Sequence, residues 1–212
     1  MENTVRIYIA DRETLAISPR EVARYLGYSR EALALPPDDA IEEAIRKARG
    51  LCAGKACYGR YPVSFFGEDG INMPYGEVHS RDLRRNLDGC GEVYIFAATI
   101  GAALDREMAR ARLKGMSEPA LLQAAGAAAV EAVCDEVNAL LEKEAAEEGR
   151  SLRRRFSPGY GDLGLENQKG VFELLNPAKH IGLTLMDTLI MSPEKSVTAI
   201  IGIAEKDGGS GK

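Results

Sequence analysis

The 212-residue sequence is poor in the residues that build metal centres. It contains only two histidines, His79 and His180, and four cysteines. Two histidines exclude a histidine-rich metal site, and the pair Cys52 and Cys57 has the wrong spacing for a zinc site. We therefore expect no metal centre, and we interpret the cysteines as reduced, partly buried thiols of a cytoplasmic protein.

Long apolar runs and an excess of positive charge are also absent. No uninterrupted apolar run reaches the roughly 18 residues that a membrane-spanning helix needs. The first residues, MENTVRIYIADRE, lack the basic start and apolar stretch of a secretory signal. The net charge of −5 at pH 7 argues against a general nucleic-acid binder. We expect a cytoplasmic protein that binds neither membrane nor nucleic acid.

The common enzyme signatures are missing as well. No GxGxxG segment follows the first expected strand, and there is no Walker loop, GxSxG elbow or HExxH helix. The segment GCGE at 89–92 is too short for a phosphate loop, and nothing places either histidine beside a thiol. The motifs alone therefore indicate no familiar catalytic centre.

The sequence does contain a mixture of extended and helical patterns. Apolar residues alternate over 4–10 and run continuously over 91–101, which predicts two strands. Helices are expected after the capping residues Ser18, Asp39, Ser80 and Ser117. Near the C-terminus we expect a short helix at 167–176 and then two strands joined by a turn around Pro193. Because strands and helices do not alternate regularly, we predict an α+β fold.

Residues 117–149 carry the strongest helical pattern in the chain. Small residues around Gly126 predict that a neighbouring segment approaches the helix closely. Glu131 and Asp135 lie one turn apart on a polar face of this helix. The simplest interpretation of that face is a solvated surface.

The most unusual stretch is RRRFSPGYGD, residues 153–162. Arg155 offers a planar guanidinium that fits a carboxylate or a phosphate. Pro158 and Gly159 favour a turn in which a ligand can approach the main chain, and Tyr160 adds a ring and a hydroxyl. These groups suit a small zwitterion joined to a ring system. The alternative is an ordinary loop whose arginines pair with the acidic end of the preceding helix.

This stretch and the residues after it resemble the C-terminal activation domain of cobalamin-dependent methionine synthase. That family shows an Arg-x-x-x-Gly-Tyr loop, a short helix ending in Glu-Leu-Leu, then Lys-His-x-Gly, a Leu-Thr strand and a proline turn before Ser-Val. In this sequence the corresponding residues are Arg155 with Gly159 and Tyr160, Glu173–Leu175, Lys179–Gly182, Leu183–Thr184, Pro193 and Ser196–Val197. The first 90 residues match that domain poorly and look more like its short, free-standing relatives.

The resemblance implies a fold and an activity. We expect one unit over 1–204 with a twisted, largely antiparallel sheet and flanking helices, made of a diverged part at 1–90 and a core at 91–204, followed by a flexible tail at 205–212. The family's domain binds S-adenosylmethionine. With flavodoxin or a similar electron donor, it supports the reductive methylation of inactive cob(II)alamin. This chain, which shows no cobalamin-binding motif, would act in trans on a cobalamin-dependent methionine synthase or a related corrinoid methyltransferase, and would not be a complete enzyme alone.

The resemblance also implies site residues. Arg155 would pair with the methionine carboxylate of the ligand, Glu131 would accept a hydrogen bond from its amino group, and backbone groups near Ser157 and Gly159 would hold the adenosyl part. Tyr160 would face the cobalamin and is the candidate catalytic residue. One alternative is a module that binds S-adenosylmethionine or a corrinoid protein without a role in methyl transfer. Another is a scaffold with no ligand.

Overall fold

The computed structural model describes residues 4–28, 38–113 and 115–205. Its elements are, in chain order, β1 (Arg6–Ile9), α1 (Pro19–Tyr25), α2 (Asp38–Leu51), β2 (Lys55–Pro62), β3 (Ser64–Phe66), β4 (Gly70–Met73), β5 (Gly76–His79), α3 (Arg81–Asn86), β6 (Cys90–Thr99), α4 (Ala103–Ala111), α5 (Ser117–Glu147), β7 (Arg150–Leu152), α6 (Asn167–Leu175), α7 (Pro177–Ile181), β8 (Thr184–Leu185), β9 (Met191–Ser192) and β10 (Ser196–Glu205).

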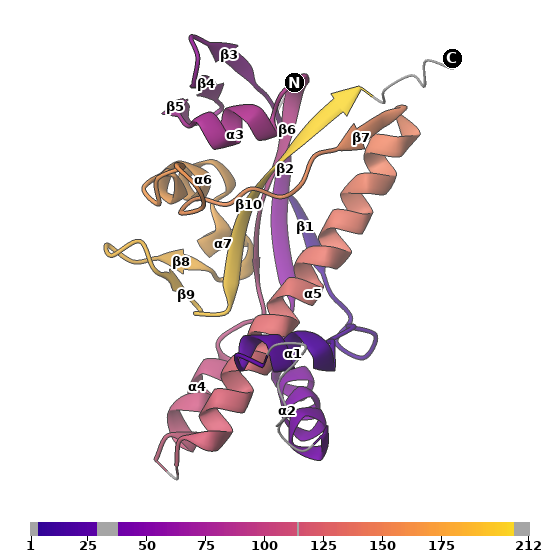
Figure 1. Ribbon diagram of the computed structural model, residues 1–212, viewed down its shortest axis with the longest axis vertical. Coiled ribbons are helices and arrows are strands. Elements are labelled where there is room, and N and C mark those ends of the chain that lie inside the picture. Colours follow the sequence, from indigo (N-terminus) through magenta and orange to yellow (C-terminus); the bar gives the residue numbers. More distant parts are fainter. Residues whose placement is uncertain (1–3, 29–37, 114, 206–212) are drawn as a thin grey trace.

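A five-stranded sheet in the order β1-β2-β6-β10-β7 forms the centre of the molecule, and every neighbouring pair is antiparallel. The sheet is twisted, with its long strands running along the long axis of the molecule (Figure 1). Strand β2 pairs with β6 along its whole length, from Lys55 opposite Thr99 to Pro62 opposite Glu92. The predicted α+β fold with a twisted antiparallel sheet is confirmed.

Strand β6 is buried on both of its faces, which explains its continuously apolar sequence. Tyr94 and Phe96 enter one hydrophobic core. Val93 and Ile95, which alternate with them, enter a second core on the opposite side of the sheet. Burial of each large apolar side chain contributes about 1.5–3 kcal/mol, so this strand stabilises both layers at once.

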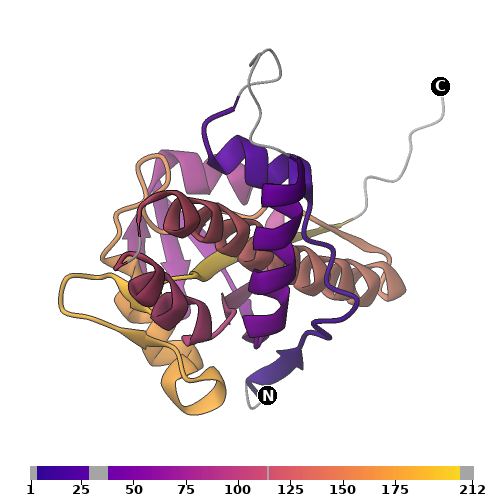
Figure 2. The same cartoon turned by 90° about the horizontal axis from the view of Figure 1, so that it is seen from below.

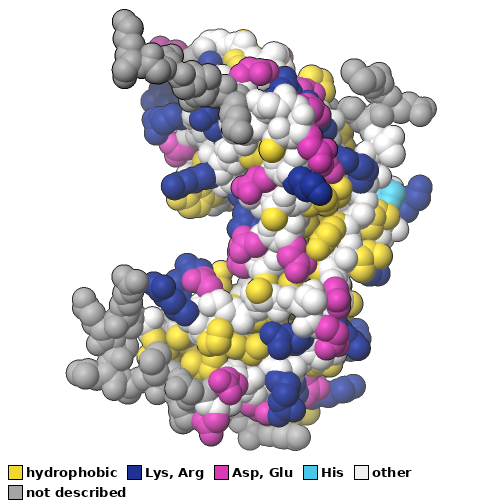
Figure 3. Space-filling view, turned by 90° about the vertical axis from the view of Figure 1, so that its right-hand side faces the viewer, with side chains coloured by type: hydrophobic (Ala, Val, Ile, Leu, Met, Phe, Trp, Pro, Cys, Tyr) yellow, Lys and Arg dark blue, Asp and Glu magenta, His cyan; other side chains and the backbone are white. Residues whose placement is uncertain are grey.

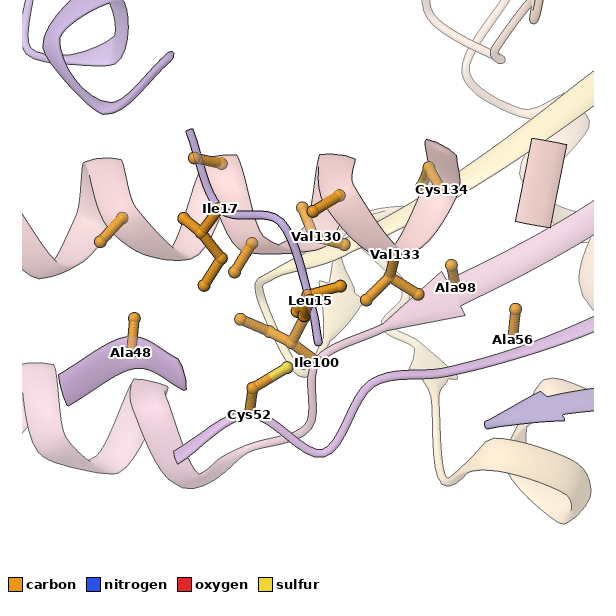
Figure 4. Packing of buried hydrophobic residues seen from close by; sticks show 14 of the residues in the cluster. Leu15, Ile17, Ala48, Cys52, Ala56, Ala98, Ile100, Val130, Val133 and Cys134 are labelled. Atoms are coloured by element: carbon orange, nitrogen blue, oxygen red, sulfur yellow. The ribbon is translucent and has the colours of Figure 1, made fainter. Parts of the chain in front are cut away.

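Helix α5 covers one face of the sheet and is itself covered by α1, α2 and α4, as the view from below shows (Figure 2). Leu15 and Ile100 meet Val133 of α5 in this layer (Figure 4). At Gly126, an added Cβ would overlap the side chain of Leu104 and lie 3.2 Å from Cε of Lys195. At this position the small residue of the helix thus makes room for side chains of its neighbours, whereas the prediction concerned a neighbouring backbone.

The other face of the sheet packs against shorter elements. Helices α6 and α7 contact β2 and β6. The small sheet β3-β4-β5 and helix α3 lie beyond them at the upper end of the view (Figure 1). None of the described helices combines the length and the apolar character that a membrane crossing requires.

Local predictions met mixed outcomes. The side chains of Ser18 and Ser80 accept hydrogen bonds from the backbones of α1 and α3, as expected of capping residues. Ser117 does not cap α5, because it is already the first helical residue and the capping position falls on Met116. A turn does lie at Pro193, as predicted: residues 193–195 form the bend between β9 and β10. The segment before it differs from the prediction, because it folds into the short hairpin β8–β9 and not into one strand. The predicted tail lies outside the described residues from position 206 on.

Candidate functional site

The segment after β7 continues alongside β10 and brings Arg155 to the middle of α5. Phe156 anchors this segment through two backbone hydrogen bonds with Ile200 of β10, of 2.9 and 2.8 Å. The adjacent Arg155 then reaches α5, where its Nη2 donates to Oε2 of Glu131 at 3.1 Å and to Oδ1 of Asp135 at 2.9 Å. Its Nη1 is buried and finds no hydrogen-bond partner among the described residues.

The two carboxylates at this point of α5 differ in their surroundings. The Glu131 side chain is 38% exposed, whereas that of Asp135 is 71% exposed. Burial raises the pKa of Tyr25 on α1, and the charge of Glu131 adds to that rise, so the phenol lies within electrostatic reach of Glu131. Burial also raises the pKa of the Cys134 thiol to about 12. Cys134 therefore stays protonated at neutral pH and is no nucleophile.

A tight bend follows Arg155. The Gly159 amide donates to the carbonyl of Leu163 at 2.8 Å, and the Tyr160 amide donates to the carbonyl of Ser157 at 3.1 Å. Gly159 has φ +87°, a conformation that favours glycine. The Tyr160 side chain is 69% exposed, and its ring lies edge-on to Phe156 with centroids 5.4 Å apart. The bend thus presents a phenol to the outside on a backbone held by its own hydrogen bonds.

Asp162 fixes the end of this bend to helix α3. Its carboxylate accepts hydrogen bonds from the Ser80 hydroxyl, from the Arg81 amide at 2.8 Å and from the Asp82 amide at 3.2 Å. The bond from Ser80 is the main cause of a lowered pKa for Asp162. A carboxylate at a helix N-terminus is also favoured by the helix dipole. The bend is therefore tied to the fold at both ends.

The structure brings together two of the residues that the sequence singled out, Arg155 and Glu131. Ser157, Gly159 and Tyr160 form the adjoining bend. The sequence assigned Asp135 to a solvated face, and it is largely exposed, yet it shares the guanidinium of Arg155 with Glu131. Its position one turn after Glu131 was the available signal.

The alternative of an ordinary loop placed the partners of the loop arginines at the acidic end of α5. There, Glu148 is paired with Arg60, and Arg153 donates to the carbonyl of Asp88 at 2.8 Å. The partners of Arg155 instead lie near the middle of the helix. Tyr25 was not predicted as part of this region, because its position depends on α1 folding against α5. Asp162 belongs to the stretch that stood out in the sequence, but its bonds to α3 were not predicted.

The surface is hollowed at mid-height between an upper and a lower half (Figure 3). Helix α5 runs through both halves in Figure 1. Within the described ranges, no three His, Cys, Asp or Glu residues lie close enough to hold a metal ion.

No protein-family model matches the chain, and no curated protein matches it in sequence. Among solved structures, it is similar to a crystal structure of the MetH reactivation domain bound to AdoHcy. The likeness covers 99% of this chain and 81% of the other, with a TM-score of 0.67 and 15% sequence identity. At that identity the comparison establishes the fold, and it agrees with the fold expected from the sequence resemblance.

Proposed function

We propose that this chain binds S-adenosylmethionine and acts as a reactivation protein for a cobalamin-dependent methionine synthase or a related corrinoid methyltransferase. The observation that carries the proposal is the meeting of Arg155 and Glu131 at mid-helix on a fold like that of the AdoHcy-bound MetH domain. AdoHcy, S-adenosylhomocysteine, is what remains of S-adenosylmethionine after it gives up its methyl group. The two molecules share a carboxylate, an ammonium and an adenosyl part.

The residues present fit such a ligand. Nη1 of Arg155 is buried and unpaired within the described structure, and an unsatisfied buried donor of this kind costs free energy until it is paired. A ligand carboxylate would satisfy it, and charge-assisted bonds to arginine are among the stronger ones. Glu131 would accept a hydrogen bond from the ligand's ammonium. The bend at Ser157 and Gly159 would hold the adenosyl part.

In this proposal the chain positions a methyl donor in front of a partner. The sulfonium methyl group and one electron from a flavodoxin-like donor convert inactive cob(II)alamin on the partner into methylcobalamin, and S-adenosylhomocysteine leaves. Arg155 and Glu131 would fix the amino-acid end of the ligand. The exposed Tyr160 would stand at the rim that meets the partner, beside the reacting groups.

The experiment is a calorimetric titration with S-adenosylmethionine, followed by an assay for methylcobalamin on a cob(II)alamin-loaded methyltransferase with a reductant. We expect saturable binding, and methylcobalamin that forms only when this chain and S-adenosylmethionine are both present. Binding without any gain in methylcobalamin would favour a binding module with no role in methyl transfer. Absence of binding, with and without the partner, would contradict the proposal.

A further inference from the structure

Arg155 makes both of its carboxylate bonds from one nitrogen of its guanidinium. Both of its carboxylate contacts, at 3.1 Å to Glu131 and 2.9 Å to Asp135, come from the same nitrogen, Nη2. Nη1 is buried without a partner in the part of the chain that the structure describes. Two carboxylates thus occupy both N–H donors of Nη2, while Nη1 has no hydrogen-bond partner among the described residues.

Another arginine that contacts α5, Arg6 of β1, uses both of its terminal nitrogens to bind one carboxylate. Nη1 and Nη2 of Arg6 donate to the two oxygens of Glu144 at 2.9 and 2.8 Å. Parallel bonds of this kind are the preferred geometry between a guanidinium and a carboxylate. A ligand carboxylate bound to Arg155 in the same way needs both Nη1 and Nη2. One of the carboxylates now on Nη2 must then give way.

Of the two carboxylates bonded to Arg155, Asp135 is the one that a ligand can displace more easily. Its side chain is 71% exposed against 38% for Glu131, so water can solvate it once it is released. Its pair with Arg155 is of the exposed class that contributes little. Glu131 is the more enclosed of the two and lies within electrostatic reach of Tyr25.

Building on the proposed function, we propose that Asp135 is a placeholder. It occupies Nη2 of Arg155 until the carboxylate of the ligand displaces it, while Glu131 stays in the site. Asp135 then acts on ligand affinity through Arg155 and is a positioning residue. It lowers the affinity for ligands that carry an amino-acid carboxylate and has no effect on ligands without one.

The test compares two ligands on three proteins by calorimetry. The ligands are S-adenosylhomocysteine and 5′-methylthioadenosine, which keeps the adenosyl part but lacks the amino-acid end. The proteins are the wild type, Asp135→Asn and the control Glu142→Gln. Glu142 is another acid of α5, bonded to Asn138 at 2.7 Å. The control removes the same charge from the same helix without touching the Arg155 contacts.

We expect Asp135→Asn to bind S-adenosylhomocysteine about two- to fivefold more tightly, which is the range expected from an exposed ion pair. Its affinity for 5′-methylthioadenosine should equal that of the wild type, and Glu142→Gln should match the wild type with both ligands. Asp135→Ala should also bind S-adenosylhomocysteine more tightly and 5′-methylthioadenosine equally well. This second variant shows that the effect comes from the loss of the carboxylate and not from the new asparagine side chain.

The outcomes separate this inference from the proposed function. A wild type that binds S-adenosylhomocysteine, with an Asp135→Asn variant that binds it equally or more weakly, overturns the placeholder role and leaves the proposed function standing. An equal gain for both ligands also overturns it, since the effect would then be independent of the carboxylate. A wild type that binds neither ligand, with and without the partner, overturns both proposals.

Discussion

Two arginine clusters on α5 are built in different ways. At the end of the helix, Arg60 donates from Nε and Nη2 to Glu92 at 3.0 and 2.7 Å, and from Nη1 and Nη2 to Glu148 at 2.6 and 2.8 Å. Every side-chain nitrogen of Arg60 is thus paired. Near the middle of the helix, Arg155 pairs one nitrogen with two carboxylates and leaves Nη1 buried and without a partner within the described residues.

Under the proposed function, the difference separates an arginine that completes the fold from one that binds a ligand. The Arg60 cluster joins β2, β6 and the end of α5, and Arg150 of β7 extends it through Glu92. All of its partners belong to this chain, so no side-chain nitrogen of Arg60 is left to bind a ligand. Arg155 has unused hydrogen-bonding capacity beside a bend with an exposed phenol. The two clusters should therefore respond differently to the same kind of substitution.

The largest effect is expected from the residue that holds Arg155 in place. Phe156 is buried and bonded through its backbone to Ile200. Phe156→Ala should lower the free energy of unfolding by about 3 kcal/mol, because it leaves a cavity beneath the bend. Chemical denaturation measures this loss. Tyr160→Ala, which truncates an exposed ring, is the control and should cost far less; equal stability of the Phe156→Ala variant and the wild type would contradict the account.

Arg155→Ala should weaken binding of S-adenosylhomocysteine by about 1.5–3 kcal/mol, the range for hydrogen bonds to charged groups. This corresponds to a Kd roughly 10- to 150-fold higher. Calorimetry gives the affinity, and a thermal melt reports whether the variant is folded. Arg60→Ala serves as the matched control and should bind like the wild type. If both variants bind equally well, Arg155 does not belong to the site.

Arg60→Ala should lower the free energy of unfolding by about 1 kcal/mol, since its pairs are partly exposed and such pairs contribute little. The loss should shrink in high salt, which screens the interaction in the wild type. Denaturation at low and high ionic strength measures the loss of stability and its dependence on salt. Arg60→Ala should thus lose stability and keep its ligand affinity, whereas Arg155→Ala should lose ligand affinity. A loss of ligand affinity in Arg60→Ala would contradict the distinction between the two clusters.

The Arg60 cluster should also be sensitive to acid. Arg60 is the main cause of a pKa for Glu92 below its usual value of 4.5. A carboxylate whose pKa is lower in the folded state stabilises the fold above its unfolded value and loses that contribution as the pH falls through the folded value. The stability gap between wild type and Arg60→Ala should therefore narrow as the pH falls below 4.5 and through the lowered pKa of Glu92. Denaturation between pH 3 and pH 7 tests this, and a constant gap would count against it.

The smallest effect on stability is expected for Tyr160→Phe, which removes one hydroxyl from an exposed ring. The free energy of unfolding should stay within about 0.5 kcal/mol of the wild type, and ligand affinity should be unchanged. The rate of methylcobalamin formation on the partner should fall if the phenol stands beside the reacting groups. A wild-type rate would reduce Tyr160 to a packing residue.

Much of the fold could be predicted from local patterns. The apolar run of β6 indicated a strand buried on both faces, and the small residues around Gly126 indicated a close contact. The errors arose where a sequence pattern is compatible with more than one position for the end of an element. Ser117 stands one residue inside the helix that it was expected to cap, because helix ends depend on the neighbouring turn.

The candidate site was only partly predictable for a similar reason. Arg155 and the glycine bend stand out in the sequence, since few other roles require those residue types together. Asp135 looks like any exposed acid until the chain pairs alongside β10 and brings Arg155 to it. Neither the unpaired Nη1 nor the double pairing of Nη2 is visible in a sequence, because both depend on how α5 and the loop pack.

A crystal structure of the protein with S-adenosylhomocysteine would test the central claim most directly. The account predicts that the ligand carboxylate bonds to both Nη1 and Nη2 of Arg155, with the ammonium on Glu131 and Asp135 turned to solvent. A ligand bound elsewhere, with Arg155 still bonded to Asp135, would contradict it.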